Sequence, residues 1–124
     1  MIISNANTEL TKGWNIEIYQ SKFLLQCYPS TGFTQATTTL SSNVWYNLVV
    51  TYSGGNQVFY NNGTQNGSVT RTFDPSTSQV VIGKWLALPL FLKSNVSQIL
   101  FYNRALSATE ILQNFNQTRS RFGV

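Results

Sequence analysis

Apolar and polar residues alternate in several short stretches of this chain, and such alternation predicts β-strands. Residues 14–20 alternate and predict one strand, and residues 22–28 are interpreted as its neighbouring strand. The polar pair 20–21 between them predicts a tight turn. Residues 44–52 carry the strongest strand pattern because aromatic and β-branched side chains are concentrated there, and we expect Trp45 to lie in the core.

The remaining β-prone stretches are shorter, and turn residues separate them. They are residues 34–40, 57–60, 69–73, 79–82 and 96–102. The pair Asn62-Gly63 predicts a hairpin, since both residue types tolerate the positive φ angles of a type I′ turn. Many short strands at near-regular spacing predict an all-β sandwich.

One helix is predicted near the end of the chain, from residue 108 to about 118. Ser107 and Glu110 fit the S-x-x-E capping box, in which the hydroxyl accepts from the N–H of Glu110 and the carboxylate accepts from the N–H of Ser107. Ile111, Leu112 and Phe115 form an apolar stripe on one side of this helix. We therefore expect the helix to lie against the sheet surface.

The composition fits a folded β-protein. A length of 124 residues indicates one domain over residues 1–124. Hydrophobic residues make up 42% of the chain, which excludes a disordered segment. Charged residues make up only 10%, and uncharged Ser, Thr, Asn and Gln take their place. This composition suits many turns and a neutral polar surface.

The net charge of +4 is not arranged for nucleic-acid binding. The eight basic residues are scattered along the chain, and only Arg119 and Arg121 lie close together. The longest apolar run, residues 85–92, contains Pro89 and is too short to span a bilayer. No signal peptide is visible. We expect neither nucleic acid nor a membrane among the partners.

The chain carries few residues that catalysis or metal binding could use. It has no His and a single cysteine, Cys27, which we expect to be a buried strand residue. Its four acids do not form the paired carboxylates that glycoside hydrolysis requires. Asp74 precedes Pro75 and fits the start of a turn better than a metal ligand. We expect no enzyme activity, no metal and no cofactor.

Two segments resemble the concanavalin A-like lectin/glucanase superfamily in its laminin G-like branch. The first is WYNLVVTYSGG at residues 45–55, continued by VFYNNG at 58–63, and the second is YNRALSATEI at 102–111. The segment VIG at 81–83 is also similar to the family pattern. The resemblance implies a concanavalin A-like antiparallel β-sandwich, or jelly roll, with one short C-terminal helix. It marks as fold residues Trp45, Tyr102, Asn103, Arg104, Ser107 and Glu110.

The resemblance is weaker toward the front of the chain. Family domains begin with strands that pair with the C-terminal ones, and few residues precede Trp14 to supply them. Ser94 stands where the family has Gly, and Ser97 and Gln98 stand where it often has acids. Because open sheet edges invite pairing, we expect a sandwich that is incomplete alone or is completed by a partner chain.

Binding is the activity for which the chain has suitable residues, since sugar sites combine aromatic rings with amide and hydroxyl groups. The run 85–92 is apolar without alternation, so it is either buried under the sheet or presented to a partner, and we favour the partner surface. The candidate contact residues, for a protein partner or a glycan, are Trp85, Leu88, Phe91, Trp14 and Tyr28.

The chain ending at residues 114–123 resembles versions of this module in phage structural proteins, where it decorates capsids, tails or fibres. We therefore expect a non-enzymatic structural or decoration module of a virion or similar extracellular assembly. It would act through contacts with other structural subunits, in an oligomeric or strand-completing arrangement. The alternative is a lectin-like adhesin module that binds a cell-surface glycan.

Overall fold

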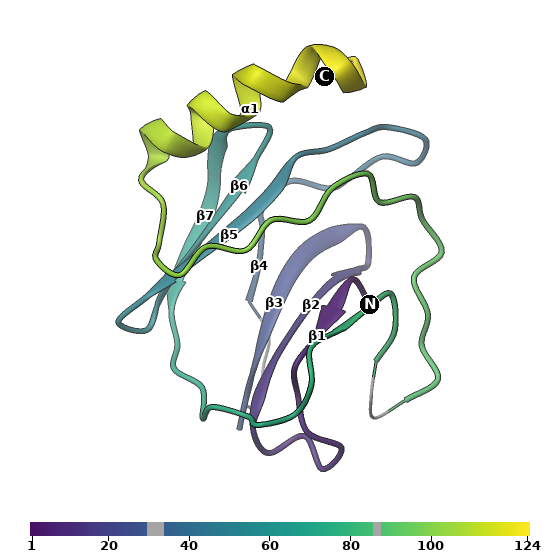
Figure 1. Ribbon diagram of the computed structural model, residues 1–124, viewed down its shortest axis with the longest axis vertical. Helices are drawn as coiled ribbons and strands as arrows, with labels where there is room; N and C mark the ends of the chain where they lie inside the picture. Colours follow the sequence, from purple (N-terminus) through teal and green to yellow (C-terminus); the bar gives the residue numbers. More distant parts are fainter. Residues whose placement is uncertain (30–33, 86–87) are drawn as a thin grey trace.

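Two antiparallel sheets face each other in the computed structural model, and a helix lies at one end of them (Figure 1). The structure describes residues 1–29, 34–85 and 88–124. One sheet has the strand order β4-β3-β2-β1-β8 and the other has the order β5-β6-β7. The elements are β1 Ile3–Ser4, β2 Gly13–Tyr19, β3 Lys22–Tyr28, β4 Thr34–Gln35, β5 Leu48–Ser53, β6 Asn56–Asn61, β7 Thr64–Thr70, β8 Val81–Ile82 and α1 Ala108–Phe122.

The predicted hairpin over residues 14–28 is confirmed as β2 and β3. Gln20 and Ser21 both have positive φ, which is the backbone of a type I′ turn. Ile16 lies opposite Leu25, and Ile18 lies opposite Phe23. Because directly opposed residues share a face, this register places these four side chains on the inner side of the sandwich.

The three-stranded sheet is a meander whose turns match the glycine signals in the sequence. Gly54 and Gly55 join β5 to β6, and both have positive φ. Asn62 and Gly63 join β6 to β7 with φ of 51° and 77°, as the Asn-Gly pair predicts. In this register Val50 lies opposite Phe59, so both side chains face the other sheet.

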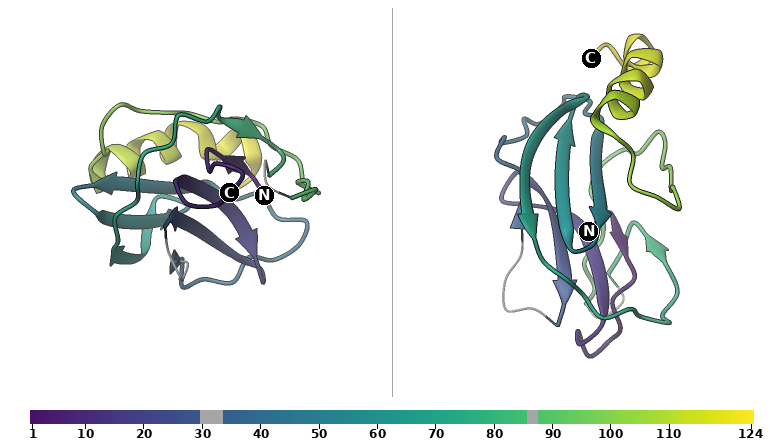
Figure 2. Two further views of the ribbon diagram at one scale, coloured as in Figure 1. Left: turned by 90° about the horizontal axis from the view of Figure 1, so that it is seen from below. Right: turned by 90° about the vertical axis from the view of Figure 1, so that its left-hand side faces the viewer.

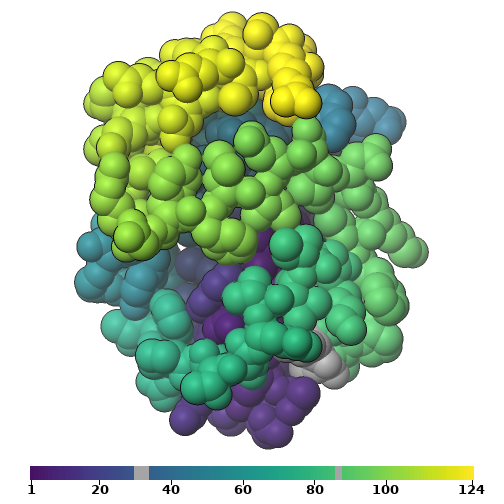
Figure 3. All heavy atoms as spheres, viewed as in Figure 1, coloured from purple at the N-terminus to yellow at the C-terminus, as the bar shows by residue number. Residues whose placement is uncertain are grey.

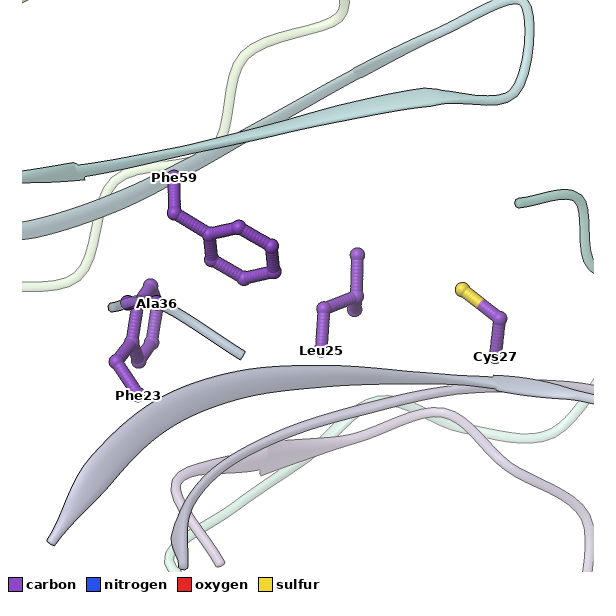
Figure 4. Close-up of a cluster of buried hydrophobic side chains, with 5 residues drawn as sticks. All are labelled: Phe23, Leu25, Cys27, Ala36 and Phe59. Atoms are coloured by element: carbon purple, nitrogen blue, oxygen red, sulfur yellow. The ribbon is translucent and has the colours of Figure 1, made fainter. Parts of the chain in front are cut away.

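The core lies between the two sheets (Figure 4). Phe23 of β3 meets Phe59 of β6 edge to face, with ring centroids 5.9 Å apart. Leu25, Cys27 and Ala36 complete this buried cluster. Cys27 is a buried free thiol on a strand, as its position predicts. An antiparallel β-sandwich with one short C-terminal helix is therefore confirmed.

The predicted helix is present and begins where the capping box places it. Its N-cap is Ser107, and the αL residue Gly123 caps the C-terminus. The helix is four residues longer than the pattern indicates, because the last turn continues to Phe122. It packs over the β6–β7 turn, where Gly63 lies close to Leu112 and Phe115.

Five strand predictions need correction. Two strands begin later than expected, since the strand predicted over 44–52 is Leu48–Ser53 and the strand predicted over 79–82 is Val81–Ile82. Of residues 34–40 only Thr34–Gln35 pair, and the strand expected over 69–73 lies earlier, at Thr64–Thr70. Residues 96–102, all of them described, form no strand. Their β-branched and aromatic residues suit a strand, but none of the described strands pairs with them, and a strand requires such a neighbour.

Candidate functional site

An apolar cleft of about 1270 Å³ opens between the two sheets on the side where β5 ends the three-stranded sheet. Its floor is the inner face of the five-stranded sheet, which contributes Ile16, Phe23 and Leu25. Val50 of β5 lines one wall. The cleft is larger than most small-molecule sites, which span about 300–1000 Å³.

The opposite wall of the cleft is a single length of chain, residues 93–106, which we call the strap. The strap crosses the front of the molecule as a separate band below the helix (Figure 3). Its apolar side chains are largely open to solvent, with Leu100 58% and Phe101 60% exposed. Large apolar side chains that are adjacent and exposed indicate an interaction surface more often than chance.

The end of the strap is fixed to the start of the helix. Arg104 donates from Nη1 and Nη2 to the two carboxylate oxygens of Glu110, at 2.9 and 2.6 Å. Glu110 also accepts from the N–H of Ser107 at 2.9 Å, and its own N–H donates to Ser107 Oγ at 3.3 Å. The Arg104 guanidinium, followed by the Ser107 N–H, lowers the pKa of Glu110 to about 2.

These contacts explain most of the fold residues in the YNRALS segment. Arg104, Ser107 and Glu110 form one exposed network that sets where the strap becomes helix. Tyr102 accepts a hydrogen bond from Asn114 Nδ2 at 3.3 Å, and Asn103 is exposed beside it. The contacts of this network are made among its own members, and they hold the end of the strap against the start of the helix.

A second group of polar side chains lies on the outer face of the five-stranded sheet, around Asn15. Asn15 is 0% exposed. Its amide oxygen accepts from the Tyr28 hydroxyl at 3.1 Å and from Trp85 Nε1 at 3.0 Å. Its amide nitrogen donates to Ser4 Oγ at 2.7 Å. This amide orientation is the one that gives every neighbouring donor an acceptor.

The surroundings of Tyr28 show that this group is structural. Burial, with a smaller contribution from the nearby Glu17 carboxylate, raises the pKa of Tyr28 to about 12. Burial likewise raises the pKa of Glu17. Tyr28 is only 3% exposed, so its ring has no free face to stack on a sugar or a partner.

The candidate contact residues thus fall into three places. Trp85 and Tyr28 meet at Asn15, whereas Trp14 lies on the inner face and lines the cleft. Leu88 and Phe91 stand in an exposed loop, with Phe91 64% exposed. The run 85–92 is therefore divided: Trp85 is half-buried against the sheet, residues 86–87 lie outside the described residues, and 88–91 face solvent.

Trp45 is not a core residue, contrary to the sequence prediction. It precedes β5, is 41% exposed and contacts Phe122 at the far end of the helix, with ring centroids 5.6 Å apart. The strand begins three residues later, at Leu48. Trp45 therefore faces the cleft rather than the packed centre of the sandwich.

The strap residues Leu100 and Phe101 were not among the predicted contacts, because the pattern assigned them to a strand. A signal for them does exist in the sequence. Residues 99–102 are four consecutive apolar or aromatic side chains, and such a run has no polar face for solvent. It therefore indicates a segment that is covered on both sides by other polypeptide.

The described residues contain no group of three or more His, Cys, Asp and Glu side chains that could hold a metal ion. Within the same ranges, no helix is long and apolar enough to cross a membrane. Glu110, one of the four acids, is already engaged by Arg104 and Ser107.

Comparison with known proteins identifies the family to which this architecture belongs. A laminin G-type family model, described as the Concanavalin A-like lectin/glucanases superfamily, matches residues 1–112. The chain belongs to this superfamily. No curated protein matches the chain.

Among solved structures, this concanavalin A-like domain is similar to an S-layer domain-containing protein (residues 221–444) from Clostridium thermocellum, at 22% identity and a TM-score of 0.56. The match covers 93% of this chain and 61% of the other chain. The chain thus spans about three fifths of the length of that structure, and the likeness supports the shared fold.

Proposed function

We propose that this concanavalin A-like domain is a non-enzymatic structural or decoration module of an extracellular assembly such as a virion capsid, tail or fibre. It acts by contacts with other protein subunits. The observation that carries the proposal is the exposed loop 88–91, which presents Leu88, Leu90 and Phe91 together. Side chains of this kind gain most free energy when a partner surface removes them from water.

Three further observations support a structural role. The polar atoms of Asn15 form internal hydrogen bonds, and the Tyr28 ring is buried. This group of side chains therefore offers no surface for a sugar. The similar solved structure is of an S-layer domain-containing protein. A structural role is also consistent with the use of Glu110 as a cap.

The proposal is tested by sedimentation velocity on the purified chain over a wide range of concentration. We expect symmetric self-association that Phe91→Ser and Leu88→Ser weaken by about tenfold or more, as for residues near the centre of an interface. Val80→Ser is the matched control, because Val80 is also half-exposed but lies outside the loop and the cleft.

A chain that stays monomeric throughout would overturn the proposal. If that monomer also bound a sugar on a glycan array with sub-millimolar affinity, the lectin-like alternative would replace it. If Phe91→Ser and Val80→Ser weakened self-association equally, loop 88–91 would not be the contact surface.

A further inference from the structure

The edge of β5 faces the strap across the cleft, and nothing pairs with it there. Among the described strands β5 pairs only with β6. The side view shows the strap lying beyond β5, on the far side from β6 and β7 (Figure 2). In Figure 1 the strap runs in the same general direction as β5. Both line the same cleft.

The hydrogen-bond register shows which β5 groups face the cleft. The N–H of Asn62 donates to the carbonyl of Asn47 at 2.9 Å, so residue 47 is bonded toward β6. In an antiparallel pair such positions alternate, and residues 48, 50 and 52 therefore point their backbone groups the other way. The N–H and C=O of Val50 and Tyr52 are directed into the cleft.

Because β5 and the strap run in the same general direction, a single additional strand between them completes a simple arrangement. One strand antiparallel to both would form hydrogen bonds with each, because alternate strands of an antiparallel sheet are parallel to each other. We propose that the cleft is a docking site for one extended strand supplied by a partner subunit. The strand would insert between β5 and residues 96–102 and convert the strap into a strand. The choice of a partner subunit as the source rests on the proposed function.

The inserted strand comes from outside these 124 residues. Among the described residues the named strands are already paired in the two sheets, and residues 36–40 are held by backbone hydrogen bonds from Ala36, Thr37 and Leu40. Segment 96–102 forms the wall of the cleft. A second copy of the chain has the same segments and would have to unpair one of them to donate it. A strand from a different polypeptide carries no such cost.

The lining of the cleft specifies the chemistry of this strand. Its inward positions would be apolar, because they meet Phe23 and Leu25 on the floor. Its outward positions would favour acids near Lys93 and Arg119, whereas Arg104, the third charged side chain of the described lining, is already paired with Glu110. About seven residues, or roughly 23 Å at 3.3 Å per residue, would match the length of segment 96–102.

The test uses a probe strand tethered to the whole chain. Seven residues that alternate Val with Thr or Glu are fused before Met1 through a flexible Gly/Ser linker, since Ile2 and Ile3 line the cleft and keep the junction close to it. The matched control fusion has the same length and the same linker, with its residues in a non-alternating order and its central residue replaced by Pro, which cannot pair on both edges.

The readout is amide hydrogen exchange at Val50 and Tyr52 together with the melting temperature. We expect the alternating probe to slow exchange at both amides by about tenfold or more relative to the control fusion and to raise the melting temperature. Equal exchange in the two fusions would overturn the proposal. So would slow exchange at these amides in the unfused chain, because the strap itself would then close the edge.

These outcomes are separate from those that test the proposed function. If the chain self-associates through Phe91 while the probe leaves Val50 and Tyr52 unprotected, strand insertion fails and the structural role stands. If the probe closes the cleft but the chain neither self-associates nor depends on Phe91, the strand site stands, and a partner subunit is no longer supported as its source.

Discussion

Gln57 of β6 donates a hydrogen bond from Nε2 to Sγ of Cys27 on β3, at 2.9 Å, and so joins the two sheets through the centre of the core. The same amide accepts from Thr34 Oγ1 at 2.6 Å. Gln57 is fully buried, so its polar atoms have no access to water. The amide is therefore the polar tie between two otherwise apolar faces.

Gln57→Ala should lower the free energy of unfolding by about 1–3 kcal/mol, because the buried hydrogen-bonding groups around it lose their partner. Urea titration followed by tryptophan fluorescence measures this. Gln65→Ala on β7 is the matched control, since Gln65 is exposed and should change stability by less than about 0.5 kcal/mol. Equal effects of the two substitutions would mean that the inter-sheet bonds contribute little.

The thiol of Cys27 should be nearly unreactive in the folded protein. Burial raises its pKa, so less thiolate is present at a given pH than in an exposed cysteine. Because the folded state favours the neutral thiol, its contribution to stability is full below the pKa of the unfolded thiol and declines as the pH rises past it. Iodoacetamide labelling followed by mass spectrometry should be slow in buffer and fast in urea. Rapid labelling in buffer would show that the core opens readily.

The local parts of the fold were predictable because their signals are local. The turn at 20–21, the Asn62-Gly63 hairpin and the capping box at Ser107 each depend on a few adjacent residues, and each is present. The conformation of residues 96–102 was not predictable in this way. A strand exists only beside a partner strand, and the sequence pattern of one segment does not say whether that partner is present.

The candidate site depended on tertiary placement that the pattern does not contain. Trp45 has the surroundings of a strand residue in the sequence, yet it lies before β5 and meets Phe122 of the helix. The contact of Trp85 with Asn15 joins residues 70 positions apart. The predicted shortage of strands at the front stays a prediction: β1 pairs with both β2 and β8, whereas β5 pairs only with β6 among the described strands.

The strap–helix junction should loosen in acid. Glu110 has its pKa lowered from 4.5 to about 2, chiefly by Arg104, so the folded state favours its charged form. Its contribution to stability is therefore complete above about pH 4.5 and is lost as the pH falls through the pKa near 2. Helical circular dichroism in thermal melts between these limits should show this decline, and Glu110→Gln should flatten it. An unchanged pH dependence in Glu110→Gln would assign the decline to another acid.

Gly13 and Gly54 both have positive φ, but only Gly13 is confined by its neighbours. A Cβ at Gly13 would lie 2.5 Å from the backbone oxygen of Asn5, whereas one at Gly54 would meet nothing within 4 Å. Gly54→Ala should cost about 1–2 kcal/mol from backbone strain alone. Gly13→Ala should cost about 1–3 kcal/mol more, because the chain between β1 and β2 must move. Paired chemical denaturation curves measure the difference. Equal losses would mean that this chain segment shifts freely and does not fix the register of β1 on β2.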